Sequence, residues 1–433
     1  MSLGFLLMAA ATFALDRGSV AWLVPLRTLL QTYVFADAQS SAELLATIAA
    51  GLITVTSITI SLLLIALQQA ASALTHQVYD QFLRNWQNQV YFGFFVGLSL
   101  YTLVTLASAG PLNPVIGASV ALVSTVFALY LLLILFYTTV DQMRPVVIIE
   151  AIHRHTLAAR EVQRELLGRT RRAPQCQGTV SLPVKAVAHG FVTRIDVDCI
   201  EAATKRAGAE VEVILRVSVG DFVVFGQLLA EVKAHAQDDA LAVAEVLEDA
   251  VRREGLRDLA NDPLDGIEEL ETIAWTSIST AKSDPDAGVL TIYSLRDILA
   301  RWSVEDRVAR GVPAPVVYED NVLPRLLNAF ESLAVSASES MQHQSYAEVL
   351  RSFELLFDGL PSDLQSRAED AILRSLSGLG DHVLTAELEA ALTALITRLE
   401  RAGRGQTAAA VLAAKLKLAG SIGKLGARST RSG

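Results

Sequence analysis

Cysteine is scarce in this chain of 433 residues, since only Cys176 and Cys199 occur, and no CxxC or Cys/His spacing accompanies them. This pattern gives no basis for a zinc site or a disulfide framework. Charged residues are also few, at 19%, and 46 acidic residues against 36 basic ones leave a net charge of −10. A net acidic chain without a basic stripe argues against nucleic acid as a partner.

Motifs of the common catalytic and nucleotide-binding classes are also absent from the sequence. We find no Walker loop, dinucleotide fingerprint, nucleophile elbow or HExxH pattern. We therefore expect a protein that is not an enzyme. We predict no catalytic residue, no metal ligand and no cofactor.

Long apolar runs are abundant, by contrast, in the first third of the chain. Residues 44–67 contain no charged side chain, and about 20 apolar residues are enough for a helix to cross a bilayer. Further apolar stretches occupy residues 2–15, 90–107 and 114–140. These four stretches predict a helical bundle of about four spans, in contact with the lipid bilayer.

Arginines near the ends of the predicted spans indicate an orientation. Seven arginines lie between residues 144 and 172, whereas the short segment 108–113 has no basic residue. Basic residues concentrate on the cytoplasmic side of membrane proteins. We therefore expect a multi-pass protein of the bacterial inner membrane whose C-terminal domains are cytoplasmic.

The periodicity of the sequence changes several times after residue 140. Helical spacing gives way to period-two alternation punctuated by Gly and Pro, and then returns. Within the alternating part, residues 198–207 are typical of a short helix capped by Asp198. The predicted fold class is a membrane α-helical bundle with an α+β cytoplasmic region. Its segments are a transmembrane domain at 1–140, a connector helix at 141–177, a small β-rich domain at 178–237, a helical domain at 238–310, a helical C-terminal region at 311–425 and a disordered tail at 426–433.

A stripe of polar residues follows one face of the second apolar run. Its spacings of 7, 3, 4 and 7 keep the members together on a helix of 3.6 residues per turn. Hydroxyls in such a stripe line a pore or contact neighbouring helices, and small hydroxyl residues commonly do the latter in membranes. The members are Thr47, Thr54, Ser57, Ser61 and Gln68.

Gly93 and Gly97 form a GxxxG pattern at the start of the third apolar run. Glycines four residues apart allow a second helix to approach closely. The pattern predicts helix packing, either within one chain or between the subunits of a homo-oligomer.

Three polar groups in the C-terminal part have a simpler interpretation than a binding site. His153 and His155 are two residues apart, which places them on different helix faces and makes a metal site a poor fit. Acidic residues at 262–271 are typical of a helix N-terminus. Asp284 and Asp286 flank Pro285 in a predicted turn that could be a small binding loop or a helix cap.

Several separated motifs resemble a bacterial family of membrane proteins of unknown function, domain-of-unknown-function family 2254. Residues 66–68 and 82–85 match its "ALQ" and "LRNF" motifs, and 89–97 match its "QVVLG-FVG" motif. HGFVTRIDV and VGDFVVFGQLL are similar to its "SGYV-AID" and "PGDFV--G-PL" motifs, whereas STAKSDPDAG departs from its "LSPAINDP-TA" loop. The resemblance implies membrane location and this domain order, and it implies no activity.

We therefore expect a non-enzymatic membrane protein that forms an oligomeric, channel-like or regulatory assembly with a cytoplasmic sensing domain. The hydroxyl stripe and the connector helix favour this hypothesis. The alternative is a membrane-anchored scaffold that binds a protein partner through its cytoplasmic domain.

Overall fold

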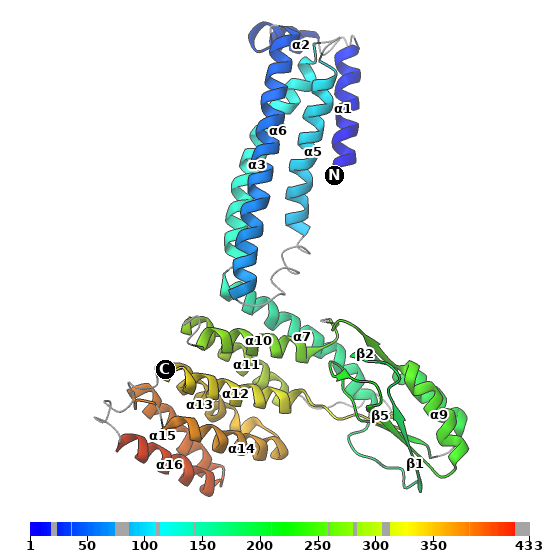
Figure 1. Ribbon diagram of the computed structural model, residues 1–433, viewed down its shortest axis with the longest axis vertical. Helices are drawn as coiled ribbons and strands as arrows, with labels where there is room; N and C mark the ends of the chain where they lie inside the picture. The colour runs from blue at the N-terminus through cyan, green and yellow to red at the C-terminus, as the bar shows by residue number, and fades with distance from the viewer. Residues whose placement is uncertain are drawn as a thin grey trace. The chain divides into compact units, whose positions relative to one another are not determined.

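The computed structural model divides the chain into two compact units, Met1–Ile148 and Ile149–Gly433, which are described one at a time (Figure 1). The residues described are 1–18, 24–35, 37–73, 86–109, 113–142, 144–208, 210–258, 260–279, 284–304, 312–380 and 382–420. The predicted tail at 426–433 lies outside them.

The first unit is a bundle of helices. Among the described residues, three helices are long and apolar enough to cross a membrane. The remaining predicted span, residues 2–15, corresponds to α1, which has 16 residues and is shorter than the usual span of about 20. The chain is therefore an integral membrane protein by its helices. The helices of this unit are α1 (Ser2–Arg17), α2 (Val24–Tyr33), α3 (Ala38–Ala73), α5 (Trp86–Ala107) and α6 (Val115–Gln142).

Within this unit α1 packs along α5, and α3 packs against both α5 and α6 (Figure 1). The contact between α1 and α5 is close because α5 presents two glycines to it. A Cβ atom added to Gly97 would lie 2.3 Å from Cδ2 of Phe5, and one added to Gly93 would lie 3.3 Å from Met1. The ring of Phe5 also packs edge-on against Phe94 at 5.4 Å.

A buried carboxylate joins α1 to the start of α6. Asp16 is 3% exposed, and its two oxygens accept hydrogen bonds from the backbone N–H groups of Ile116 and Gly117, each at 2.9 Å. These amides belong to the first turn of α6, where backbone donors have no partner within the helix. Tyr101 on α5 completes the group by donating to the carbonyl of Gly117 at 3.0 Å.

The second unit begins with most of α7 (Pro145–Arg169) and contains two small sheets. One sheet has the strand order β1-β5-β3-β7, and the other has the order β4-β2-β6. All strand pairs are antiparallel except β3 with β7. The strands are β1 (Val180–Lys185), β2 (Gly190–Ile195), β3 (Glu212–Leu215), β4 (Phe222–Val223), β5 (Leu228–Ala234), β6 (Val251–Glu254) and β7 (Val316–Val317).

Helices α8 (Val197–Ala207) and α9 (Gln237–Ala250) share one apolar core with these strands. The core includes Val192, Val213, Val232 and Leu247, all almost fully buried. Helix α8 starts one residue earlier than expected, so Asp196 caps it by accepting from the amide of Cys199 at 3.0 Å. The predicted cap, Asp198, pairs instead with Arg169.

Two strands come from outside the segment that the sequence predicted as β-rich. Strand β6 follows α9 directly and pairs with β2, whereas β7 follows Pro313 and Pro315 and pairs with β3. The sheets therefore draw on residues far beyond 178–237. Strand β6 has four residues and β7 has two, and strands this short show no clear alternating pattern in the sequence.

The remainder of the second unit is helical, as predicted, and neighbouring helices pack in pairs such as α10 with α11 and α13 with α15. Both α10 and α11 begin at an Asp-Pro pair in which the aspartate caps the helix and the proline occupies its first turn. The helices are α10 (Pro263–Ile278), α11 (Pro285–Ser303), α12 (Val322–Glu339), α13 (His343–Leu356), α14 (Ser362–Leu379), α15 (Ala386–Arg401) and α16 (Gly405–Ala419).

The substitution Gly97→Ala should destabilise the helical bundle. Its methyl group would displace the ring of Phe5, and overpacking of this kind costs about 1–3 kcal/mol. The apparent melting temperature of the full chain in detergent should fall. Gly4→Ala on α1 is the matched control, because no atom lies within 4 Å of the added carbon. Equal melting of the two variants would show that the helices do not pack this closely.

Candidate functional site

The polar stripe lies on the exposed side of α3. All five members, Thr47, Thr54, Ser57, Ser61 and Gln68, are exposed in the single chain. The side that contacts α5 and α6 is formed instead by apolar residues that include Leu45, Leu52, Leu63 and Leu67. The stripe therefore faces away from the two helices against which α3 packs.

Hydroxyl groups of the stripe bond to the backbone of their own helix. Thr47 donates to the carbonyl of Glu43 at 2.8 Å, Thr54 to that of Ala50 at 2.8 Å and Ser61 to that of Ser57 at 2.9 Å. This back-bonding to the fourth preceding carbonyl satisfies the hydroxyl hydrogen without a second helix. Each oxygen keeps acceptor capacity toward the outside of the bundle.

The predicted helix-packing glycines, Gly93 and Gly97, face α1 of the same chain through Met1 and Phe5.

The two aspartates of the predicted loop site have different positions at the start of α11. Asp284 accepts from the amide of Ala287 at 3.4 Å as the cap of α11, Asp286 is exposed in the first turn, and 280–283 lie outside the described residues. The two aspartates thus occupy positions that stabilise a helix N-terminus.

The second unit contains a cleft of about 500 Å³ formed by α7, the segment after β7 and the first turns of α12 and α14. Its floor carries Arg160, which is 3% exposed and binds Asp320 through two hydrogen bonds of 3.0 and 2.8 Å. The guanidinium carbon also lies 5.2 Å from the centre of the Trp302 ring. Exposed arginines and acids line the rest: Glu161, Arg164, Arg172, Glu319, Asp363 and Arg367.

A partly buried arginine that no sequence motif indicates organises the acidic segment at 262–271. Arg257 lies 2.7 Å from Asp262 and 3.4 Å from Asp265, and it also pairs with Glu268. Within the described residues, no group of three or more potential ligands is arranged to hold a metal ion. Arg257 lies outside the predicted helix, so spacing within that helix could not indicate it.

Glu269 belongs to the same helix, but one of its oxygens is buried without a hydrogen-bond partner. Burial, reinforced by the negative charge of Asp265, raises the pKa of Glu269 from 4.5 to about 8. The carboxyl group is therefore protonated at neutral pH in the folded protein. No pattern in the sequence distinguishes Glu269 from the exposed acids beside it.

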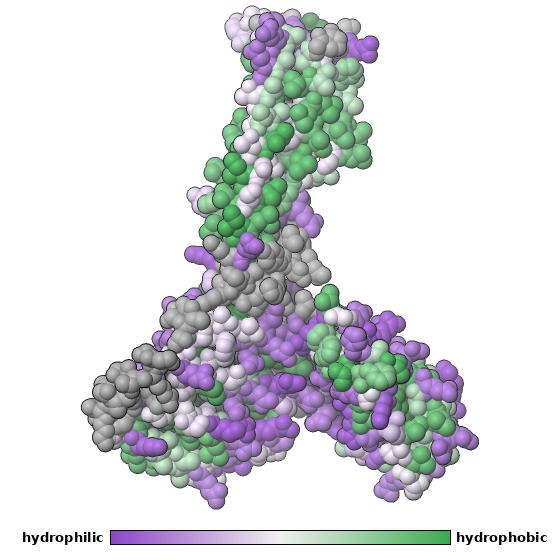
Figure 2. Space-filling model, viewed as in Figure 1, coloured by the Kyte–Doolittle hydropathy of each residue, from purple (hydrophilic) through white to green (hydrophobic). Residues whose placement is uncertain are grey.

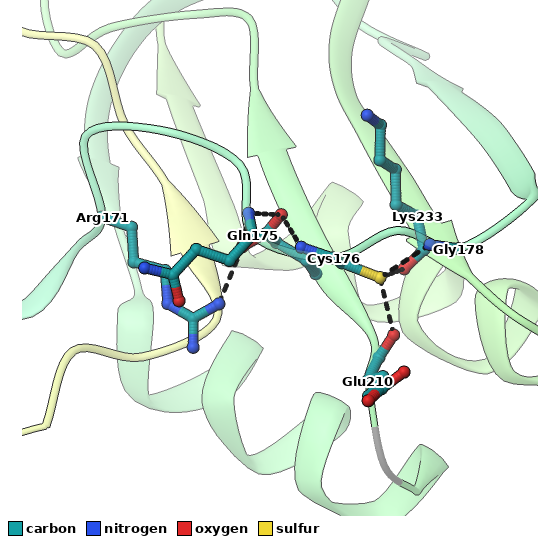
Figure 3. Close-up of polar contacts among 7 residues, drawn as sticks. Arg171, Gln175, Cys176, Gly178, Glu210 and Lys233 are labelled. Carbon is teal, nitrogen blue, oxygen red and sulfur yellow. Dashed lines mark hydrogen bonds and ion pairs between the residues drawn. The ribbon is translucent and has the colours of Figure 1, made fainter.

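Cys176 serves as a local structural contact (Figure 3). Its sulfur lies 2.9 Å from the carbonyl of Glu210, and it accepts from the amide of Gly178 at 3.3 Å. Nearby, Glu212 is 1% exposed and binds Arg171 together with the backbone amides of residues 175 and 176. Cys176 and Cys199 are both free cysteines.

His153 is mostly buried, with 12% of its side chain exposed. One ring nitrogen lies 2.8 Å from the hydroxyl of Ser294, and the other lies 3.1 Å from Asp297. Ser294 and Asp297 are three residues apart on α11, so they share a face toward α7. The Ser-His-Asp combination joins two helices, and its serine is only 9% exposed.

A bundle with three candidate spans and an α+β unit define the chain as an integral membrane protein with a large extramembrane part. The chain belongs to the family described as "Predicted membrane protein (DUF2254)", which matches residues 1–336. This match confirms the resemblance that the sequence motifs indicated. No curated protein and no solved structure matches the chain.

Glu269→Gln should make the protein more stable at alkaline pH. The pKa of Glu269 is about 8 in the folded protein, against 4.5 for the same group in the unfolded chain. Between these values the folded protein retains a proton that the unfolded chain loses, so stability falls as the pH rises from about 4.5 to 8. The slope is at most about 1.4 kcal/mol per pH unit. Removing the ionisable group should raise the melting temperature at pH 8 and above and leave it nearly unchanged near pH 4.5.

Glu271→Gln provides the matched control, since it makes the same substitution two residues along α10. The two variants are compared by thermal unfolding of the full chain from pH 4.5 to 9. A melting temperature of Glu269→Gln that parallels the unmodified protein at every pH would show that Glu269 ionises normally.

Proposed function

We propose that this protein is a non-enzymatic, oligomeric assembly of the bacterial inner membrane, channel-like or regulatory, whose soluble unit is a cytoplasmic sensing domain. The outward orientation of the polar stripe on α3 is the observation that carries this proposal. The seven arginines that follow the last span support the cytoplasmic placement of the soluble unit.

The outer face of α3 has the repeat of a helix-packing seam. With Ala50 and Leu64 included, the stripe follows an alternation of three and four residues from position 47 to position 68. This is the 3.5-residue repeat by which two helices pack over a long distance. Five of the seven positions hold Ala, Ser or Thr, which allow close approach of a second helix in a membrane. A polar amide, Gln68, ends the series.

A second copy of the chain is the partner that this face fits best. The two seams would be identical, and symmetric contact between identical surfaces is the commonest form of assembly. In a dimer the hydroxyl oxygens would contact the neighbouring helix, and in a larger ring they would line a central path. The cleft around Arg160 and Asp320 would then serve as the ligand site of the sensing domain.

Disulfide cross-linking tests the seam directly. In a background of Cys176→Ser and Cys199→Ala, the variant Ser61→Cys should form a cross-linked dimer in native membranes after mild oxidation. Leu62→Cys is the matched control, because Leu62 is the next residue and is 61% exposed, yet lies outside the stripe. Cross-linking at position 61 should exceed that at position 62 several-fold, and Thr54→Cys should behave like Ser61→Cys.

Equal cross-linking at positions 61 and 62 would contradict the seam, because random collision in the membrane does not distinguish neighbouring residues. A chain that remains monomeric in mild detergent and does not cross-link at position 54 or 61 would contradict oligomerisation. That result would instead favour a membrane-anchored scaffold for a protein partner.

Conduction is tested separately by reconstituting the full chain in liposomes and recording ion flux. If the hydroxyl oxygens line a path, flux should appear under voltage, membrane tension or an added cytoplasmic ligand. Thr54→Leu should then reduce it, because it replaces an exposed hydroxyl by an apolar side chain. Absence of flux under all three conditions would contradict the channel and leave the regulatory assembly.

A further inference from the structure

An apolar tip distinguishes the sheet β4-β2-β6 from the rest of the second unit. It consists of Val187, Phe222, Val224, Phe225 and Leu256, of which Phe225 and Leu256 are 77% and 81% exposed. Figure 2 shows apolar surface among the hydrophilic side chains of the β-rich part. Exposed apolar patches of this kind in a folded domain mark interaction sites.

The members of the apolar tip are neighbours in space. The amide of Gly226 donates to the carbonyl of Ala186 at 2.8 Å, which places the turn that carries Phe225 beside Val187. Phe222 lies opposite Phe191 across β4 and β2, with ring centres 4.9 Å apart. A positive φ of 80° at Gly226 forms the tight turn that projects Phe225 outward.

Arginines continue this surface along the same sheet. A register shift between Val192 and Arg194 in β2 places Phe191 and Arg194 on the outer face together. Arg194 lies directly opposite Arg252 of β6, and both are exposed. Like charges directly opposite each other destabilise a sheet. Neither arginine lies within ion-pair distance of a described carboxylate, although Arg194, after Arg169, helps to lower the pKa of Asp198.

Positive charge at this face is local, since the whole chain has a net charge of −10. Lys185, at the end of β1 beside the apolar tip, is also exposed and forms no ion pair with a described residue. Glu254 is the carboxylate of β6 on the outer face, opposite Phe191. The charged side chains without an ion pair on this face are therefore three cations, Lys185, Arg194 and Arg252, and one anion, Glu254.

We infer that the apolar tip and the Arg194–Arg252 pair form a docking surface for an anionic lipid bilayer. Aromatic side chains that enter the headgroup region next to basic residues that meet lipid phosphates are the usual composition of a membrane-surface site. The apolar helices of the first unit tether the chain to a bilayer, and a tether raises the effective concentration of the second unit toward lipid. Weak insertion is therefore sufficient, and this inference does not depend on the proposed oligomer.

Lipid contact is measured on the full chain, one copy per nanodisc, with the fluorophore NBD attached at position 225. The variant is Phe225→Cys in the background Cys176→Ser and Cys199→Ala. In nanodiscs of phosphatidylcholine with phosphatidylglycerol, nitroxide-labelled lipids should quench the probe several-fold more than at Leu355→Cys. Leu355 is a matched control because it is 55% exposed on α13, outside the apolar tip. Leu256→Cys should behave like Phe225→Cys.

The contribution of the arginine pair is tested in two ways. One is the double variant Arg194→Gln, Arg252→Gln, and the other is a nanodisc of pure phosphatidylcholine, which has no anionic lipid. Either change should reduce quenching at position 225 without lowering the melting temperature, because the double substitution removes a like-charge pair from the sheet. A probe at position 225 that stays water-exposed in both lipids would overturn the inference. A probe that is shielded from water but not quenched by nitroxide lipid would also overturn it, because a protein surface would then cover the tip.

Discussion

Desolvation of charge is the constraint on which both units depend. Three deeply buried charges bind groups from a distant part of the chain, because an isolated buried charge is far more costly than a paired one. Asp16 binds the first turn of α6, and Arg160 binds Asp320 across 160 residues. Glu212 is held by Arg171 and two backbone amides. These contacts fix which helices and strands can be neighbours, and apolar packing fills the space between them.

The sequence was sufficient to predict the elements that repeat a pattern over many residues. Long apolar helices, the alternating strands and the Asp-Pro helix starts at 262 and 284 were all recognisable, since each depends on local spacing. Strands β6 and β7 were missed because they are short and exist through pairing with distant strands. The cap is Asp196, two residues before the predicted Asp198, because the helix begins at Val197.

Candidate sites were harder to predict than helices and strands, because they too depend on contacts between distant parts of the chain. Spacing on α3 predicted which residues share a face, but their exposure depends on where α5 and α6 pack. Arg257 and the acids at 262–268 form one cluster that no linear motif contains. The surface that combines Phe222 with Arg194 and Arg252 required the register of three strands and one bulge. Local sequence carries none of that information.

Strand β7 has a consequence for how the second unit tolerates a break in the chain. It supplies the parallel edge of the sheet, although it lies between helices α11 and α12. A break in the chain near β7 would therefore bare the backbone donors and acceptors of β3, an edge able to recruit strands from other molecules. The last two-residue strand thus protects the sheet from aggregation and makes the integrity of the helical part a condition for the solubility of the β-rich part.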